Sequence, residues 1–180
     1  GYTGQYVYGY NLEGDYANHM QTPEYLTTGA LDCSSLSGVQ LRFWRWLGVE
    51  ALDQAGVEVS NDGQTWVPVW ANVSAHDESE WTPHGYDISA IADGQSTVYI
   101  RWSMGPTNAS ITYPGWNIDD VEIWGIVSAP VPGDLDGDGN IDIEDFVILA
   151  GCLVGPTVPP AFGCENADLD QDMDVDMADF

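Results

Sequence analysis

Two stretches of alternating aspartates contain the residue types best suited to chemistry. In the first, carboxylates occupy the first, third, fifth, ninth and last places of a dozen residues, and Gly139 occupies the sixth. A loop with this spacing wraps oxygen ligands around Ca²⁺, and the glycine allows the sharp turn that such a loop requires. With the residue at the seventh place, the candidate ligands are Asp134, Asp136, Asp138, Asn140, Asp142 and Asp145.

The second stretch repeats this spacing further along the chain. Its candidate ligands are Asp168, Asp170, Asp172, Asp174, Asp176 and Asp179. Met173 stands where the turn glycine is expected, and left-handed backbone costs a non-glycine residue roughly 1–2 kcal/mol. The alternative is that these acidic runs are solvated tails. The matching apolar positions, Leu135 with Leu169 and Ile141 with Val175, favour two calcium loops, and the second pair is expected to join them.

The paired loops resemble the dockerin family, the duplicated calcium modules of bacterial extracellular proteins, over Pro132–Phe180. Aspartate at the last loop position is typical of dockerins, and the resemblance implies EF-hand-type loops that bind two calcium ions. The connection between the loops is longer than usual, and the sequence ends before the helix expected after the second loop. The positions with which dockerins contact cohesins hold Ile143–Glu144 and Met177–Ala178 rather than hydroxyl pairs. The resemblance therefore implies calcium but not a cohesin partner.

Charge and composition exclude several classes of partner. The chain has 180 residues, of which 44% are hydrophobic, so it is long enough for one medium domain and a small one. Three basic residues against 29 acidic ones give a net charge of -26, which excludes nucleic acid as a partner. No apolar run reaches the roughly 18–20 residues of a membrane span, and no signal segment opens the sequence.

The cysteines indicate an oxidising environment. Cys152 and Cys164 enclose the connection between the two loops, a segment too small for a core of its own, so we expect a disulfide there. This places the protein outside the cell or on its surface. Cys33 is left over, and we expect it to be a small buried residue rather than a reactive thiol.

Residues 1–126 have the pattern of strands and turns, with no helical period. Residues 39–47 alternate, with Val39, Leu41 and Phe43 on one face and Arg42, Trp44 and Trp46 on the other, as in a central strand. Residues 56–70 predict a hairpin around Asn61–Gly63, and residues 96–102 predict another core strand. In residues 143–154 apolar side chains recur at helical spacing, which predicts one short helix after the first loop.

The last predicted strand changes its pattern at Asp119–Asp120, which indicates a β-bulge. Carboxylates buried there would need a cation or Arg101 nearby. The phrases at 8–16, 41–50, 57–66 and 115–125 resemble the jelly-roll β-sandwiches related to MAM and immune-inhibitor-type modules of secreted bacterial proteins. That resemblance implies a structural calcium at Asp119 or Asp120 with Asn11 and Asp15. It also implies a strand ahead of residue 8 that is lacking here, so one sheet edge is expected to be incomplete.

The predicted fold is mainly β: a jelly-roll β-sandwich over 1–126, a linker over 127–132, and a small α-helical dockerin-like module over 133–180 with a shortened second repeat. Tyr6, Tyr8 and Tyr10 share a strand face, which suits either a half-buried strand or a surface that binds sugar or another subunit. Asn72 and Asn108 each begin an N-glycosylation tripeptide, a pattern that is common by chance.

No nucleophile elbow, zinc-binding histidine motif or phosphate loop is present in the sequence. We therefore expect a non-enzymatic extracellular calcium-binding structural protein. It would join other protein chains, copies of itself in a head-to-tail filament included, through the dockerin-like module and the open sandwich edge. The alternative is a carbohydrate-binding accessory region of a larger secreted enzyme. An exposed planar strip of tryptophan and tyrosine would favour that alternative.

Overall fold

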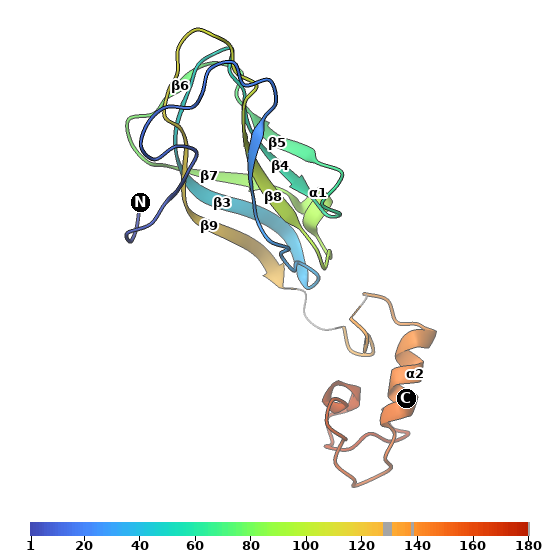
Figure 1. The fold of residues 1–180 in the computed structure, drawn as a ribbon. Coiled ribbons are helices and arrows are strands. Elements are labelled where there is room, and N and C mark those ends of the chain that lie inside the picture. The colour runs from blue at the N-terminus through green and yellow to red at the C-terminus, as the bar shows by residue number, and fades with distance from the viewer. Residues whose placement is uncertain (128–130, 138, 180) are drawn as a thin grey trace. The chain divides into compact units, whose positions relative to one another are not determined.

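The computed structural model describes residues 1–127, 131–137 and 139–179. The chain divides into two compact units, Gly1–Val127 and Ser128–Phe180 (Figure 1). Val127, which the sequence assigned to the linker, is the last residue of a strand. The next three linker residues, 128–130, lie outside the described part of the chain, as do Asp138 and Phe180.

The first unit consists of two antiparallel sheets, so the mainly β fold is confirmed (Figure 1). The first sheet has the order β1-β9-β3-β6, and β7 also pairs with β3; its strands are β1 (Tyr8–Gly9), β3 (Leu36–Val49), β6 (His76–Asp77), β7 (Thr82–Asp87) and β9 (Gly115–Val127). The second sheet has the order β2-β8-β4-β5; its strands are β2 (Glu24–Thr27), β4 (Ala55–Ser60), β5 (Val67–Ala71) and β8 (Tyr99–Met104).

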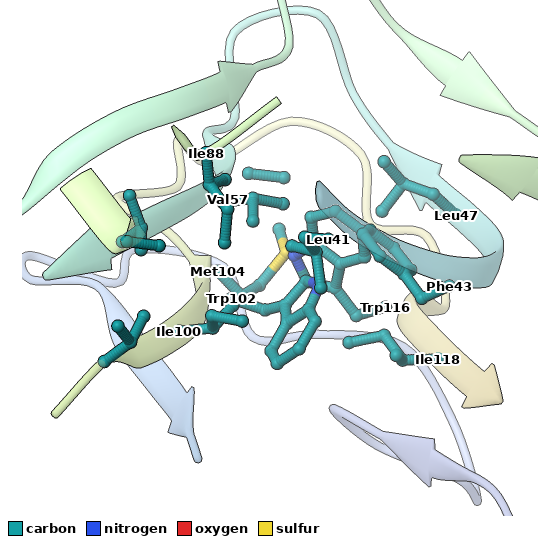
Figure 2. Packing of buried hydrophobic residues seen from close by; sticks show 14 of the residues in the cluster. Leu41, Phe43, Leu47, Val57, Ile88, Ile100, Trp102, Met104, Trp116 and Ile118 are labelled. Atoms are coloured by element: carbon teal, nitrogen blue, oxygen red, sulfur yellow. The ribbon is translucent and has the colours of Figure 1, made fainter. Parts of the chain in front are cut away.

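Strand β3 lies inside the first sheet, and both of its faces carry large side chains. Val39, Leu41 and Phe43 are buried against the second sheet, as the alternation predicts. Side chains from β4, β8 and β9 complete this core (Figure 2). Within it the rings of Phe43 and Trp102 meet edge to face at 5.4 Å, a favoured aromatic geometry. The indole N–H of Trp116 donates to the carbonyl of Ser103 at 2.7 Å, which joins the two sheets.

Arg45 is the exception to this apolar face. It is only 4% exposed, and its guanidinium forms an ion pair with Glu78 and lies 4.8 Å from the centre of the Trp70 ring. The Glu78 carboxylate also accepts the backbone N–H of Leu47 at 2.7 Å. The sequence did not predict this buried arginine, because its partner lies far along the chain.

The predicted hairpin, the predicted core strand and the buried cysteine are confirmed, but one helical turn was not predicted. Strands β4 and β5 form the predicted hairpin, with Gly63 at φ 69° in its turn. Strand β8 buries Ile100 and Trp102, and Cys33 is buried without a disulfide bond. A single helical turn, α1 (Ser89–Ala92), was not predicted, since four residues are too few for a periodic pattern.

The β-bulge is also confirmed. The register between β3 and β9 shifts between Arg42 and Trp44, which face Glu122 and Asp119, so β9 holds one extra residue there. Asp120 has φ 47°, a left-handed conformation that is uncommon outside glycine. The bulge turns its carboxylate away from the position that regular alternation would give it.

The predicted tyrosine strand is much shorter than expected. Only Tyr8–Gly9 pair with β9, so Tyr6 is 87% exposed and Tyr8 66%. Tyr16 is fully buried instead, and its hydroxyl donates to Asp53 at 2.7 Å. Burial and this hydrogen bond raise the pKa of Tyr16.

The second unit contains one helix, α2 (Ile143–Cys152), and a 3-10 turn, η1 (Glu165–Ala167), among its described residues. The helix follows the first loop as predicted and ends two residues early. Asp142 and Asp145 form a capping box at its start. A small core covers this helix, and its buried members are Leu149, Cys152, Ala167 and Val175. No helix among the described residues is long and apolar enough to cross a membrane.

Candidate metal centre

The first loop, residues 134–145, is organised by its first and last aspartates. The buried carboxylate of Asp145 accepts backbone N–H groups from Leu135 at 2.6 Å, Asp136 at 3.2 Å and Asp142 at 2.8 Å. Asp134 at the other end accepts two more, from Gly137 at 2.8 Å and Gly139 at 3.0 Å. The loop is thereby folded around carboxylate oxygens rather than extended into solvent.

The second loop, residues 168–179, has the same network at its last aspartate and a similar one at its first. Asp179 accepts from Leu169 at 2.6 Å, Asp170 at 3.2 Å and Asp176 at 2.8 Å. Asp168 accepts from the backbone N–H of Asp172 at 3.1 Å and of Met173 at 2.9 Å. The second acidic stretch is therefore folded into a loop and is not a solvated tail.

The turn at the sixth position is left-handed in both loops. Gly139 has φ 88°, and Met173 has φ 77°. The Met173 side chain is 78% exposed, so it is not packed in a way that offsets the strain of this conformation. The sequence predicted both the turn and its cost at Met173.

Among the described residues, the loop carboxylates form three groups whose oxygens lie within 4.8 Å of one another. These groups are Asp134 with Asp136 and Asp145, Asp168 with Asp170 and Asp172, and Asp174 with Asp176 and Asp179. Carboxylate oxygens at this density suit Ca²⁺, a hard cation that takes six to eight oxygen ligands. Of the other predicted ligands, Asn140 is exposed, Asp142 caps α2 by accepting the N–H of Glu144 at 3.0 Å, and Asp138 lies outside the described residues.

Electrostatics differ between the ends and the middle of these loops. The N–H donated by Asp142 lowers the pKa of Asp145, and the N–H donated by Asp176 lowers the pKa of Asp179. The pKa of Asp172 is raised: the N–H of Asp174 opposes the rise, but burial and the neighbouring carboxylates outweigh it. A cation in the second loop would relieve this repulsion.

Asp174 is bound to the connection between the loops. It is 4% exposed, and one carboxylate oxygen accepts the N–H of Thr157, while the other has no hydrogen-bond partner among the described residues. The neighbouring carbonyl of Val175 accepts N–H groups from Val154 at 3.0 Å and Gly155 at 3.2 Å. The long connection, whose structure the sequence did not predict, thus supports the second loop.

These contacts change the expected pairing of the loops. Val175 is fully buried under the connection. Ile141, which was expected to pair with it, is 65% exposed. The connection also carries a disulfide between Cys152 and Cys164, with their Cα atoms 5.5 Å apart, at the two ends of the segment that the sequence marked.

The candidate calcium site of the sandwich is divided between two places. Asp119 accepts the backbone N–H of Thr3 at 3.1 Å, and Asp120 accepts the Thr3 hydroxyl at 2.7 Å. Asn11 instead donates to the carbonyl of Asp15 at 2.9 Å, and the Asp15 carboxylate accepts the hydroxyl of Thr112 at 2.9 Å, just before β9. The described residues therefore do not bring these carboxylates into one group.

The two candidate glycosylation sites are engaged in the fold. The amide nitrogen of Asn72 donates to the carbonyl of Asp53 at 2.9 Å, and that of Asn108 donates to Glu50 at 3.1 Å. Both asparagines are half-buried. Attachment of a sugar to either nitrogen would replace a hydrogen bond that holds the adjoining loops.

Comparison with known proteins gives only distant structural similarity. No family model and no curated protein matches the sequence. Among solved structures, the chain is similar to the K3 cleaved adhesin domain of Lys-gingipain from Porphyromonas gingivalis, with 19% identity and a TM-score of 0.42 over 65% of this chain and 70% of that one. The K1 domain of the same protein gives 20% identity and a TM-score of 0.39 over 57% of this chain. The match spans 63% of the K1 domain, which is less than two thirds of its length.

Proposed function

We propose that this chain is a non-enzymatic, calcium-binding structural protein of the cell exterior that assembles with other protein chains. One observation carries the proposal. Two loops in different surroundings hold their last aspartates in the same hydrogen-bond network, with matching N–H to oxygen distances of 2.6, 3.2 and 2.8 Å. Repetition of this arrangement on the same spacing of aspartates supports a common ligand, for which Ca²⁺ is the natural candidate. The disulfide supports a place outside the reducing cytosol.

An incomplete sheet edge supports assembly. Strand β1 pairs with β9 only at Ile118 and Asn117, and on this side the rest of β9 has no strand partner among the described residues. A cavity of about 430 Å³ adjoins this edge, and Tyr8, Trp102 and Val121 contribute to its lining. An edge without a strand partner beside a cavity suits the addition of a strand from another chain.

Carbohydrate binding is the second candidate, and a specific surface favours it. The outer face of the first sheet, which points away from the second sheet, bears Trp44, Trp46 and Trp124, with Trp81 against Trp46 at 6.1 Å between ring centres. Trp124 is 52% exposed and Trp46 37%. Such a strip of rings is what the sugar-binding alternative requires.

Calcium dependence of the second unit tests the first proposal. All 8 tryptophans and all 9 tyrosines belong to the first unit, so their fluorescence reports on the sandwich alone, whereas calorimetry detects both units. Addition of a chelator should abolish the calorimetric transition of the second unit and leave the fluorescence transition in place, because uncompensated loop carboxylates repel one another.

Variants give the control for this experiment. Asp134→Asn with Asp168→Asn should reproduce the effect of the chelator in saturating calcium. Asp77→Asn, which removes one exposed carboxylate from the sandwich, should not. Identical calorimetric profiles with calcium and with chelator would overturn the calcium proposal.

A further inference from the structure

The outer face of the first sheet contains a hollow of about 320 Å³ between strands β3, β7 and β9. Its lining includes Arg42, Trp44, Pro83, Gly85, Asp120 and Glu122. Gly85 contributes to the opening, since a Cβ there would meet nothing nearer than Arg42 at 3.9 Å. The site thus combines an indole ring, two carboxylates and a guanidinium around a space of ligand size.

The β-bulge brings the Asp120 carboxylate to this hollow. On a regular strand, neighbouring residues point to opposite faces, so Asp119 and Asp120 could not both serve the outer face. The extra residue and the left-handed φ of 47° at Asp120 re-aim its carboxylate, which lines the hollow. Strained backbone of this kind is often kept for binding.

The chain's own N-terminal segment lies beside this hollow and contacts two of its lining residues, Trp44 and Asp120. The Tyr2 ring stacks on Trp44, with 3.6 Å between ring centres and an interplanar angle of 14°. The next residue, Thr3, donates its backbone N–H to Asp119 and its hydroxyl to Asp120. Tyr2 remains 43% exposed, so this segment lies on the surface and is not part of the core.

A flat ring on an indole, together with two donors on neighbouring carboxylates, is the set of contacts that a pyranose ring and its hydroxyl groups would make. We propose that this hollow is a carbohydrate-binding subsite centred on Trp44, and that Tyr2 and Thr3 cover the Trp44 ring and the Asp120 carboxylate at its edge until a sugar displaces them. This inference rests on the second candidate function. The ligand is a neutral oligosaccharide, because the local carboxylates and a net charge of -26 repel uronic and sulfated sugars.

The test compares sugar binding by the full chain and its variants. The probes are hexasaccharides of β-linked glucose, xylose and N-acetylglucosamine, with a galacturonate oligosaccharide as the anionic control, measured by calorimetric titration. The double variant Tyr2→Ala, Thr3→Val should bind one neutral probe about tenfold more tightly than the unaltered chain, since the stacked ring and the Thr3 hydroxyl no longer compete. Tyr6→Ala, another exposed tyrosine of the same segment, is the matched control and should change nothing.

Two further measurements locate the site. Trp44→Ala should abolish binding, whereas Trp66→Ala, on the other sheet's hairpin, should retain it. In heteronuclear NMR spectra the Trp44 indole signal should shift both on addition of sugar and in the Tyr2→Ala, Thr3→Val variant. The dispersion of the other signals in the same spectra shows whether the variant is folded.

The outcomes separate the two claims. Equal affinities of the double variant and the unaltered chain would show that Tyr2 and Thr3 do not compete with the sugar. Binding that survives Trp44→Ala would overturn the position of the subsite. If neither the chain nor the double variant binds any neutral probe, the carbohydrate function itself fails, while calcium binding and assembly stand on their own tests.

Discussion

Met173 holds a left-handed turn that its side chain disfavours. With φ 77° it takes the place that Gly139 fills in the first loop, and its side chain is exposed. Met173→Gly should therefore stabilise the calcium-loaded second unit by about 0.5–1 kcal/mol, the relief of strain less the entropy that glycine loses on folding. Calorimetric melting in saturating calcium measures this gain.

Met177→Gly is the control for that substitution. Met177 is similarly exposed, at 71%, but has no positive φ, so glycine there should bring no stabilisation. Equal effects of the two substitutions would show that the turn at Met173 carries no strain.

The Arg45–Glu78 pair illustrates how burial changes the value of an ion pair. Glu78→Gln should destabilise the sandwich by about 3–5 kcal/mol, because the 4% exposed guanidinium of Arg45 would lose its counter-charge. Glu58→Gln breaks a second arginine–glutamate pair, with Arg101, at a more exposed site and should cost about 1 kcal/mol or less. Urea denaturation followed by tryptophan fluorescence compares the two, and similar losses would contradict the distinction.

At the scale of elements, the connection between the calcium loops depends on its disulfide. Replacing Cys152 and Cys164 by alanine should destabilise the calcium-loaded second unit by about 3 kcal/mol, the chain-entropy value for a loop of this size. The melting of the sandwich, followed by fluorescence, should not change. Thiol titration of the unaltered chain under denaturing, non-reducing conditions should find Cys33 alone, and three free thiols would refute the disulfide.

Elements with local patterns were predictable from the sequence. The alternation of β3, the hairpin of β4 and β5, the helix after the first loop and the bulge in β9 all follow from residue order within about a dozen positions. Buried Arg45, the contacts of Val175 and the stacking of Tyr2 on Trp44 were not predictable in this way. Each of these contacts involves a residue that only the tertiary fold brings close, so no local sequence pattern predicts it.

The same distinction, between residues close in sequence and residues brought together by the fold, applies to the candidate sites. The candidate loop ligands are close in sequence, so their spacing alone predicted the turns of both loops, and calcium at Asp134 and Asp168 stays a prediction. The proposed sandwich site joined Asp119 and Asp120 to Asn11 and Asp15 from a different segment, and the structure gives those two other partners. The hollow beside Trp44 was missed because three strands contribute to it and a ring of the N-terminal segment covers Trp44.

For the whole molecule, a net charge of -26 opposes association unless cations reduce it. We expect the chain to self-associate in calcium, since Ca²⁺ lowers the repulsion while the β9 edge offers unpaired backbone groups to a neighbour. A contact between a sheet edge on one copy and a different surface on the next is head to tail, and it produces open filaments unless the rotation closes a ring. Light scattering should therefore show a mass that grows with protein concentration in calcium and returns to that of a monomer in chelator.

An edge variant tests whether β9 makes that contact. Val121 lies beside the bulge and lines the cavity at this edge, so Val121→Lys should place a charge where a neighbouring strand would dock and should prevent growth of the assembly. Val73→Lys adds the same charge to a loop residue that is 96% exposed and should leave assembly intact. A chain that stays monomeric at every concentration in calcium would refute self-assembly. Growth that is equal in both variants would instead place the contact away from this edge, and the free backbone groups of β9 would then need a partner of another kind.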